Sequence, residues 1–135
     1  MKVVLDTNIL ISAAIARGKP RKLLLKALAE DFILLSSNGL LRELANVISR
    51  PKFRLTPVEK RKFTNAVRKT SRLIKVKSNF KVVEEDPDDD KVLNLAYDGR
   101  ADYIVSGDPD LLNLKKFRNA KIVTASAMLE ILEGK

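Results

Sequence analysis

The sequence predicts an α/β protein of three layers, α/β/α, in which helices cover both faces of a central, mostly parallel sheet of about five strands. Short apolar runs alternate along the chain with longer segments of helical pattern. The apolar runs are continuous rather than alternating with polar residues, which is typical of strands buried on both faces. We find no repeat, low-complexity segment or linker, so we expect a single domain over residues 1–135.

The N-terminal part of the chain predicts one strand and two helices. Lys2–Leu5 (KVVL) is a short β-branched run of the kind that forms a buried strand. A helix is expected over residues 7–16, with Thr7 or Asn8 as its N-terminal cap. A glycine and a proline then separate it from a second helix over residues 21–30.

The middle of the chain predicts a strand and two further helices. Residues 32–37 (FILLSS) read as the second strand, and one residue of Ser-Ser-Asn caps a helix over residues 39–49, which stops before a proline. After a short loop, Thr56 caps a long basic helix whose first residue is Pro57 and which runs to about residue 71.

The C-terminal half begins with an ambiguous segment. One of RLIKVKS (72–78) and FKVV (80–83) is expected to be a strand. The acidic residues that follow lead into a helix over 90–99, for which Gly99 is a suitable C-terminal cap. The remaining predicted elements are a strand within 101–108, a short helix at 109–114, a strand at 121–124 and a helix at 125–134.

The composition excludes several kinds of chemistry. The chain has neither cysteine nor histidine, which removes disulfides, thiolate metal sites and the commonest general base. No apolar run reaches the roughly 18 residues that a membrane helix needs, and MKVVLDTN offers no signal-peptide cleavage site. We therefore expect a cytoplasmic protein whose chemistry uses carboxylates, hydroxyls, lysine or a hard metal ion.

Charge is distributed unevenly along the chain. The formal net charge is +9, yet five of the six residues from Glu85 to Asp90 are acidic. Residues 50–81 carry twelve Lys and Arg and one acid, whereas residues 84–110 carry ten acids and two bases. This asymmetry indicates a basic surface beside an acidic site, although charged runs are more often solvated helix faces. Acidic side chains this close repel one another, so something must offset their charge.

Carboxylates occur where strands are predicted to end. Asp6 directly follows the first strand, Asp108 follows YIVS, and Glu43 lies on the helix after the second strand. Open α/β sheets bind ligands outside the carboxyl ends of their strands, so these groups and the acidic run can meet at one edge. An all-oxygen site suits Mg²⁺ or Mn²⁺, which can lower the pKa of a bound water and stabilise charge on a phosphoryl group. A metal site beside a basic surface favours phosphodiester hydrolysis.

Each of these acids also has a purely structural interpretation. Asp6 can cap the following helix, and Glu43, beside Arg42, can be an ordinary surface residue. The acids of the run favour a helix N-terminus through its dipole, and the Asp-Pro-Asp that begins at Asp108 is common turn chemistry. It is their joint placement at one sheet edge that favours a site.

The segments VLDTNILISA, LLRELANVI, DPDDDKVLNLA and ADYIVSGDPDLL, in this order and over essentially the whole chain, resemble the PIN domain. This is a family of small metal-dependent ribonucleases that includes the VapC-like toxins of prokaryotic toxin–antitoxin pairs. The resemblance implies a PIN-like fold, and catalytic, metal-binding carboxylates at Asp6, Glu43, Asp89 and Asp108. Asp89 is the best match for the third acid, and Asp86, Asp88 and Asp90 stay open as alternatives.

Other residues receive supporting roles from the same resemblance. The residues expected to orient carboxylates or water are Thr7, Asn8, Ser106, Asp86, Asp88 and Asp110, of which Asp110 braces its loop. The basic residues expected to grip RNA are Arg17, Lys19, Arg50, Lys52 and Arg54.

The resemblance further implies a homodimer and a small antitoxin that occupies the acidic groove. An apolar stripe in RKLLLKALAE is compatible with a dimer face, and equally with ordinary core. Two alternatives remain: a housekeeping RNA-processing nuclease, and a non-catalytic RNA-binding protein of the same fold. A haloacid-type phosphatase is disfavoured because that chemistry needs an Asp where this chain has Asn8.

Overall fold

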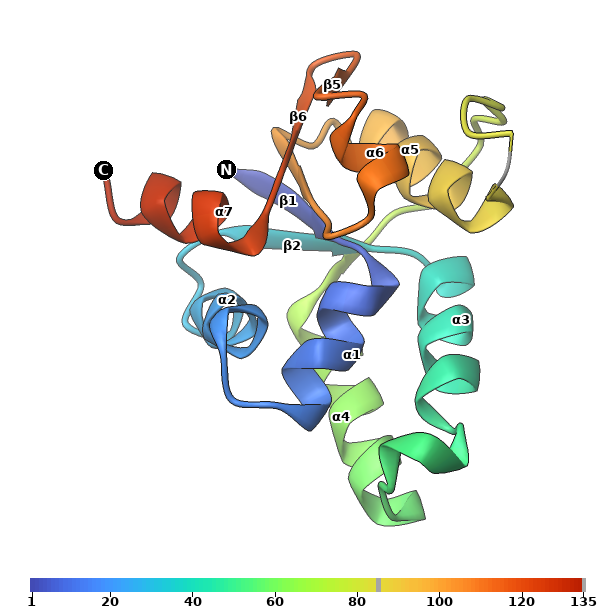
Figure 1. The fold of residues 1–135 in the computed structure, drawn as a ribbon, viewed down its shortest axis with the longest axis vertical. Coiled ribbons are helices and arrows are strands. Elements are labelled where there is room, and N and C mark those ends of the chain that lie inside the picture. Colours follow the sequence, from blue (N-terminus) through green and yellow to red (C-terminus); the bar gives the residue numbers. More distant parts are fainter. Residues whose placement is uncertain (85, 135) are drawn as a thin grey trace.

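The computed structural model describes residues 1–84 and 86–134 and is a three-layer α/β/α structure, as the sequence predicted (Figure 1). Glu85 of the acidic run lies outside the described residues. The strands are β1 (Lys2–Leu5), β2 (Ile33–Ser36), β3 (Arg72–Leu73), β4 (Tyr103–Val105), β5 (Lys116–Phe117) and β6 (Ala120–Val123). The helices are α1 (Thr7–Ile15), α2 (Lys19–Leu28), α3 (Asn38–Ile48), α4 (Pro57–Thr70), α5 (Pro87–Gly99), α6 (Pro109–Leu112) and α7 (Ala125–Leu132), with a 3₁₀ turn, η1 (Pro51–Phe53).

The described strands form one six-stranded sheet in the order β3-β2-β1-β4-β6-β5. Every neighbouring pair is parallel except β5 and β6, which are antiparallel. The strand order reverses between β1 and β4, where Leu5 pairs with Val105. In open parallel sheets such a reversal leaves a crevice outside the carboxyl ends of the two strands.

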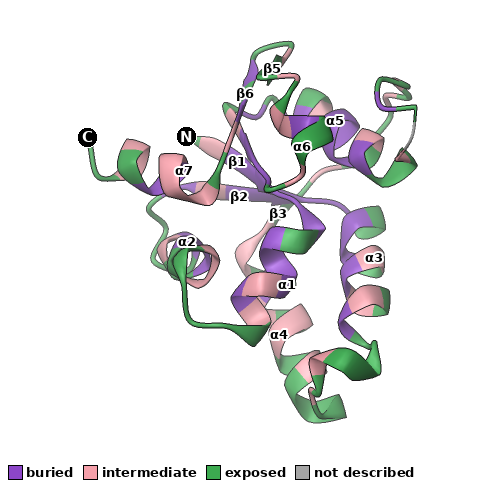
Figure 2. Ribbon diagram, in the orientation of Figure 1, coloured by how far each residue is buried: buried purple, intermediate pink, exposed green. Residues whose placement is uncertain are grey.

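Helices cover both faces of the sheet. In Figure 1, α5 and α6 lie above β2 and to the right of β6, α1 to α4 lie below β2, and α7 packs against α2. Burial follows this arrangement, since Figure 2 shows the buried residues gathered in β1 and β2 and on the inward sides of α1, α3 and α5. By contrast, Val67 is the buried residue of α4, whose basic outer side faces solvent. No helix in the described part of the chain is long and apolar enough to cross a lipid bilayer.

Helix α1 begins at Thr7 and α5 ends at Gly99, as predicted, but the two predicted cap residues were wrong. Asp6, rather than Thr7 or Asn8, caps α1, because its Oδ1 accepts a hydrogen bond from the Ile9 amide at 2.8 Å. At the end of α5 the left-handed cap is Arg100, with φ of 55°, and Gly99 is still helical. A Cβ on Gly99 would lie 2.7 Å from a methyl group of Leu35, so glycine lets α5 pack closely on β2 without displacing that side chain.

The segment before α5 confirms that one of the two ambiguous runs forms a strand. Strand β3 belongs to the first ambiguous run, whereas FKVV (80–83) forms no strand. Its backbone is instead held by side chains of α5: Asn94 bonds both the N–H and the C=O of Phe80, and Asp90 accepts from the amides of Val82 and Val83. The helix itself starts at Pro87, three residues earlier than predicted, with Asp86 as its cap.

Candidate metal centre

Carboxylates from four segments converge at the carboxyl ends of β1 and β4. A cleft of about 150 Å³ is lined there by Asp6, Thr7, Asn8, Glu43, Val47, Arg50, Asp86, Asp88, Asp89 and Val92. Asp108 lies beside the cleft, since oxygens of Asp86, Asp89 and Asp108 lie within 4.8 Å of one another. The four segments are the start of α1, the helix α3, the first turn of α5 and the loop after β4.

Asp6 and Asp108 are held by the backbone where their strands end. The Asp6 amide donates to the Val105 carbonyl of β4 at 3.1 Å, which fixes the end of β1 beside the end of β4. The fully buried Ser106 hydroxyl donates to Asp6 Oδ2 and accepts from the Asp108 amide at 3.0 Å. Asp108 Oδ1 caps α6 by accepting from the amide of Asp110. Ser106 therefore links the two strand-end carboxylates.

The N-terminus of α5 presents the acidic run to the same place. Pro87 suits the first helical position, and acids in the first turn interact favourably with the helix dipole. Asp89 is buried with its carboxylate beside Asp108 and Asp86, whereas Asp90 turns the other way to bind the amides of residues 82 and 83. The structure thus separates Asp89 from Asp90, which the sequence had kept open as an alternative third acid.

Glu43 faces this group from α3. It is half-buried, and the charges that act on it most strongly are those of Asp88 and Lys91, followed by that of Asp86. Lys91 also forms an ion pair with Asp88 at 3.2 Å. Sequence reasoning had not included Lys91 in the site, although an acid and a lysine three residues apart on a helix are a recognisable pair.

The crowding of these acids raises their pKa values. Burial, followed by the neighbouring Asp108 carboxylate and then Asp86 and Asp6, raises the pKa of Asp89 to about 8. Burial also raises the pKa of Asp6, where the hydrogen bonds from Ser106 and Ile9 oppose it. For Glu43, burial and the charge of Asp88 raise the pKa above its usual value. Without a cation the group must therefore hold protons or carry repulsion near neutral pH.

The donor chemistry fits a divalent metal ion. All the groups are oxygens, as Mg²⁺ and Mn²⁺ prefer. Two of them, Asp89 Oδ2 and Thr7 Oγ1, are buried without a hydrogen-bond partner among the described residues. Buried polar atoms normally have a hydrogen-bond partner, so a ligand bound in the cleft is the expected partner of these two oxygens.

The other residues that were predicted to support the site differ in how close they lie to it. Asn8 lines the cleft and is exposed. Asp88 lines it on its outer side, while Asp86 is closer to the centre than predicted, since it belongs to the tight group with Asp89 and Asp108. Asp110 was expected to brace its loop, but its contact runs through its backbone amide and its side chain is exposed.

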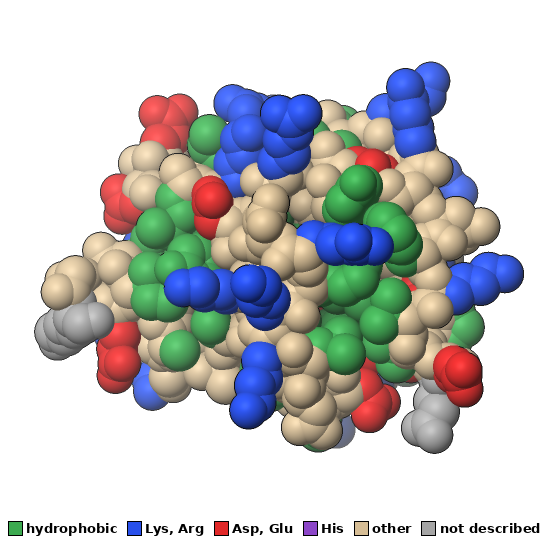
Figure 3. All heavy atoms as spheres, turned by 90° about the horizontal axis from the view of Figure 1, so that it is seen from above, with side chains coloured by type: hydrophobic (Ala, Val, Ile, Leu, Met, Phe, Trp, Pro, Cys, Tyr) green, Lys and Arg blue, Asp and Glu red, His purple; other side chains and the backbone are tan. Residues whose placement is uncertain are grey.

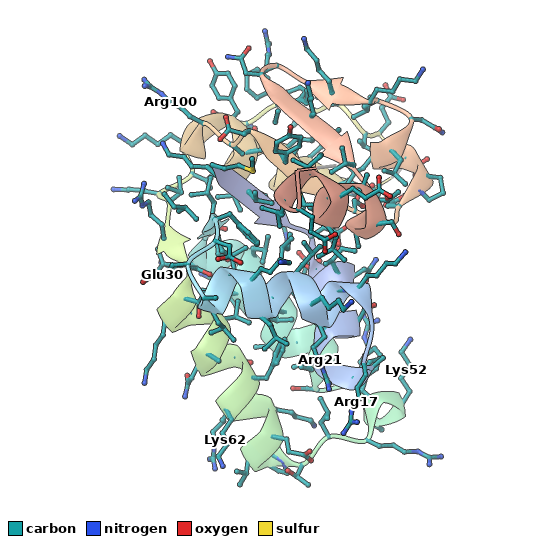
Figure 4. All side chains as sticks on the ribbon, turned by 90° about the vertical axis from the view of Figure 1, so that its left-hand side faces the viewer. Arg17, Arg21, Glu30, Lys52, Lys62 and Arg100 are labelled. Atoms are coloured by element: carbon teal, nitrogen blue, oxygen red, sulfur yellow. The ribbon has the colours of Figure 1, made fainter. Side chains whose placement is uncertain are left out.

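Among the predicted RNA-gripping residues, Arg50 is the one that lines the cleft. Figure 4 shows Arg17 and Lys52 at the lower end of the molecule, and Lys52 lies 5.1 Å from the centre of the Phe53 ring. Lys19 donates to the Ser126 hydroxyl on α7. Arg54 is exposed in a left-handed turn after η1, with φ of 54°.

Comparison with known proteins matches the chain to a protein family and to a related protein. Residues 2–110 match the model of the PIN domain. An uncharacterized protein of Methanocaldococcus jannaschii is 37% identical over 119 residues, which cover 85% of this chain and 76% of that protein. The family match spans most of the chain, including every segment that contributes an acid to the cleft. This chain belongs to the PIN domain family.

Proposed function

We propose that this chain is a metal-dependent endoribonuclease and the toxin component of a toxin–antitoxin pair, formed by one domain over residues 1–135. PIN domains are generally nucleases that use divalent metal ions. The observation that carries the proposal is the convergence of carboxylates at the β1/β4 crevice around two buried oxygens that lack a partner.

In this proposal Asp6, Glu43, Asp89 and Asp108 hold one or two Mg²⁺ or Mn²⁺ ions, with Asp86 as a further oxygen donor. A bound divalent ion would supply Lewis acidity to a phosphodiester and lower the pKa of a water.

The chain's own groups orient this site. Ser106 fixes Asp6 relative to the Asp108 backbone, and Thr7 lies beside Glu43. Arg50, which lines the cleft among the acids, is positioned to bind a phosphate oxygen.

Cleavage of a labelled single-stranded RNA with Mg²⁺ or Mn²⁺, against EDTA and against Asp6→Asn, tests the proposal. Asn caps a helix as well as Asp does, so the substitution keeps the Ile9 hydrogen bond while it removes the charge. Cleavage should fall by at least about a hundredfold, as expected for loss of a charged group that binds the metal. Asp31→Asn, an exposed acid in a surface ion pair, should cleave like the wild type. Full activity in a folded Asp6→Asn protein would contradict the assignment.

The toxin role and the partners need their own tests. Ile15, Leu25 and Leu28 are about half exposed on α1 and α2, which supports a homodimer through these helices. Light scattering of the wild type and of Leu25→Glu tests this, since the variant should become monomeric. Growth arrest on expression of the wild type, absent with Asp6→Asn and relieved by a small antitoxin, supports the toxin. Cleavage without arrest favours an RNA-processing nuclease.

A further inference from the structure

A second cavity, of about 630 Å³, opens at the opposite end of the sheet from the carboxylates. It lies beside the residues that precede β4 and β6, which is the amino end of the parallel strands. Its size is in the range of small-molecule binding sites. The polar and aromatic side chains that line it are Tyr97, Asp98, Arg100, Asp102, Phe117, Arg118 and Asn119.

The two carboxylates of this cavity are already used by backbone donors. Asp98 accepts hydrogen bonds from the amides of Lys77 and Ser78 and from the Ser78 hydroxyl. Asp102 Oδ2 accepts from the Lys2 amide at 2.8 Å. Both acids therefore serve to attach neighbouring segments, and their charge is partly offset inside the protein.

The positive charges of the two arginines in the cavity are not neutralised by an acidic side chain of the described residues. Within residues 1–84 and 86–134, no ion pair involves Arg100 or Arg118. Figure 4 shows Arg100 extending outward at the end of the molecule that carries α5, far from the labelled basic residues of the other end. The Arg118 guanidinium lies against three aromatic rings, 5.0 Å from the centre of Phe80, 5.7 Å from Phe117 and 5.9 Å from Tyr97. Ring contacts of this kind fix the plane of a guanidinium and leave its outer N–H groups free to donate.

The aromatic surface beside Arg118 is also accessible. Tyr97 is 45% exposed, and its ring packs edge-on against Phe80 at 4.9 Å, which holds it in place. Figure 3 looks onto the end of the molecule where β5 and β6 turn, and it shows hydrophobic surface crossed by Lys and Arg side chains. The half-exposed Tyr97 ring can stack on the flat ring of a ligand. The guanidinium groups of Arg100 and Arg118, which form no ion pair with a described residue, can bind a negative charge on the same ligand.

We propose that this cavity binds a nucleotide, with the phosphate on Arg100 and Arg118 and the base stacked on Tyr97. The Asn119 amide lies in the same cavity and can donate to or accept from the edge of a base. The nucleotide is either free in solution or one unit of an RNA strand. This site is separate from the acidic cleft, and its occupation does not depend on cleavage there.

The experiment is a titration of ¹⁵N-labelled protein in EDTA with AMP, GMP, CMP and UMP, followed by amide chemical shifts. Shifts are expected at residues 96–102 and 117–120, and not at residues 6–8 or 86–89. Ribose 5-phosphate and adenosine, which carry the phosphate alone and the base alone, should each bind at least about tenfold more weakly than AMP. A five-nucleotide RNA, added to Asp6→Asn so that it stays intact, distinguishes the sources: tighter binding than any mononucleotide identifies RNA as the ligand.

The variants separate binding from folding. Arg100 has a φ of 55°, which glycine adopts without strain, so Arg100→Gly should fold normally and bind about tenfold more weakly. Tyr97→Phe should keep binding because the ring remains, whereas Tyr97→Ser should lose it. Arg118→Lys keeps the charge but not the planar fork, and an intermediate loss is expected. Lys62→Ala, an exposed cation on α4 at the other end of the molecule, should bind like the wild type.

Three results would overturn the proposal. One is the absence of shifts at residues 96–102 and 117–120 with millimolar mononucleotides and with the RNA. Another is unchanged affinity in folded Arg100→Gly and Tyr97→Ser. The third is loss of mononucleotide binding in Asp6→Asn, which would place the ligand in the acidic cleft instead.

Discussion

The Thr7 hydroxyl is buried beside the Glu43 carboxylate without a regular hydrogen bond to any described group. An unpartnered buried hydroxyl costs stability, so Thr7→Val, which keeps the shape, should stabilise the protein in EDTA by about 1 kcal/mol. If the hydroxyl is kept for the site, the same change should weaken Mn²⁺ binding and slow RNA cleavage. Urea unfolding, calorimetry and cleavage assays measure the three effects. Thr64→Val is the control, because the Thr64 hydroxyl already donates to the Lys60 carbonyl. A Thr7→Val protein that is less stable than the wild type in EDTA would contradict the reasoning.

Asp89 and Asp90 are adjacent, yet they point in different directions. Asp89 is buried in the carboxylate group, while Asp90 holds the amides of residues 82 and 83. Asp89→Asn should therefore lower metal-dependent cleavage by at least about a hundredfold, and Asp90→Asn should lower it less than about tenfold. Cleavage rates at saturating Mn²⁺, with circular dichroism to verify folding, compare the pair. Equal losses would mean that the third ligand is wrongly assigned.

At the scale of elements, Asp90, Asn94 and Asp98 form one row along α5, each four residues from the next. This row binds the extended segment 77–83 by its backbone, as a neighbouring strand would. The segment has the β-branched composition of a strand, and for that reason the sequence made FKVV a candidate strand. Its true partners are side chains on a helix, and strand propensity carries no information about them. The same row points Asp90 away from the cleft, which a string of consecutive acids could not reveal.

Asp98 makes this attachment testable. Burial works against its charged form, but the hydrogen bonds from Ser78 and from the Lys77 amide prevail and lower the pKa of Asp98. Because the folded pKa is depressed, the stabilisation is present above the unfolded pKa of about 4 and is lost as pH falls through the folded value. Asp98→Asn should thus cost about 1 kcal/mol at pH 7, a value that allows for solvent screening, and almost nothing at low pH. Guanidinium unfolding at both pH values measures this, with Asp31→Asn as the surface control.

The strand ends illustrate what the sequence could predict. Asp6 and Asp108 lie at one edge of the sheet, as predicted, because each follows a short buried run and parallel strands bring such positions together. The caps were harder, since neighbouring polar residues are nearly equivalent as caps and the choice depends on the exact start of the helix. Strand β5 was missed because it is two residues long and its antiparallel pairing with β6 has no Asn-Gly or Asp-Gly turn to announce it.

At the scale of the whole molecule, a protein of net charge +9 concentrates acidic side chains at one edge of its sheet. The helix dipole of α5, the Lys91 ion pair and Arg50 offset part of the repulsion. The raised pKa values of Asp6, Glu43 and Asp89 indicate that these groups are insufficient without a further cation. The acidic cleft should therefore reduce stability in the metal-free protein at neutral pH.

The pH dependence of unfolding tests this consequence directly. Asp89 has a folded pKa of about 8, raised by burial and by Asp108, against about 4 in the unfolded chain. The folded protein then binds more protons than the unfolded chain, so this group's stabilisation is complete below about pH 4 and is lost as pH rises towards 8. In EDTA the midpoint of thermal unfolding should fall between pH 5 and pH 8, and saturating Mn²⁺ should raise it more at pH 8 than at pH 5, because protons compete with the metal. Asp89→Asn should flatten the profile in EDTA and abolish most of the Mn²⁺ effect. A midpoint in EDTA that rises over this range would mean that the carboxylates are already neutralised within the folded protein.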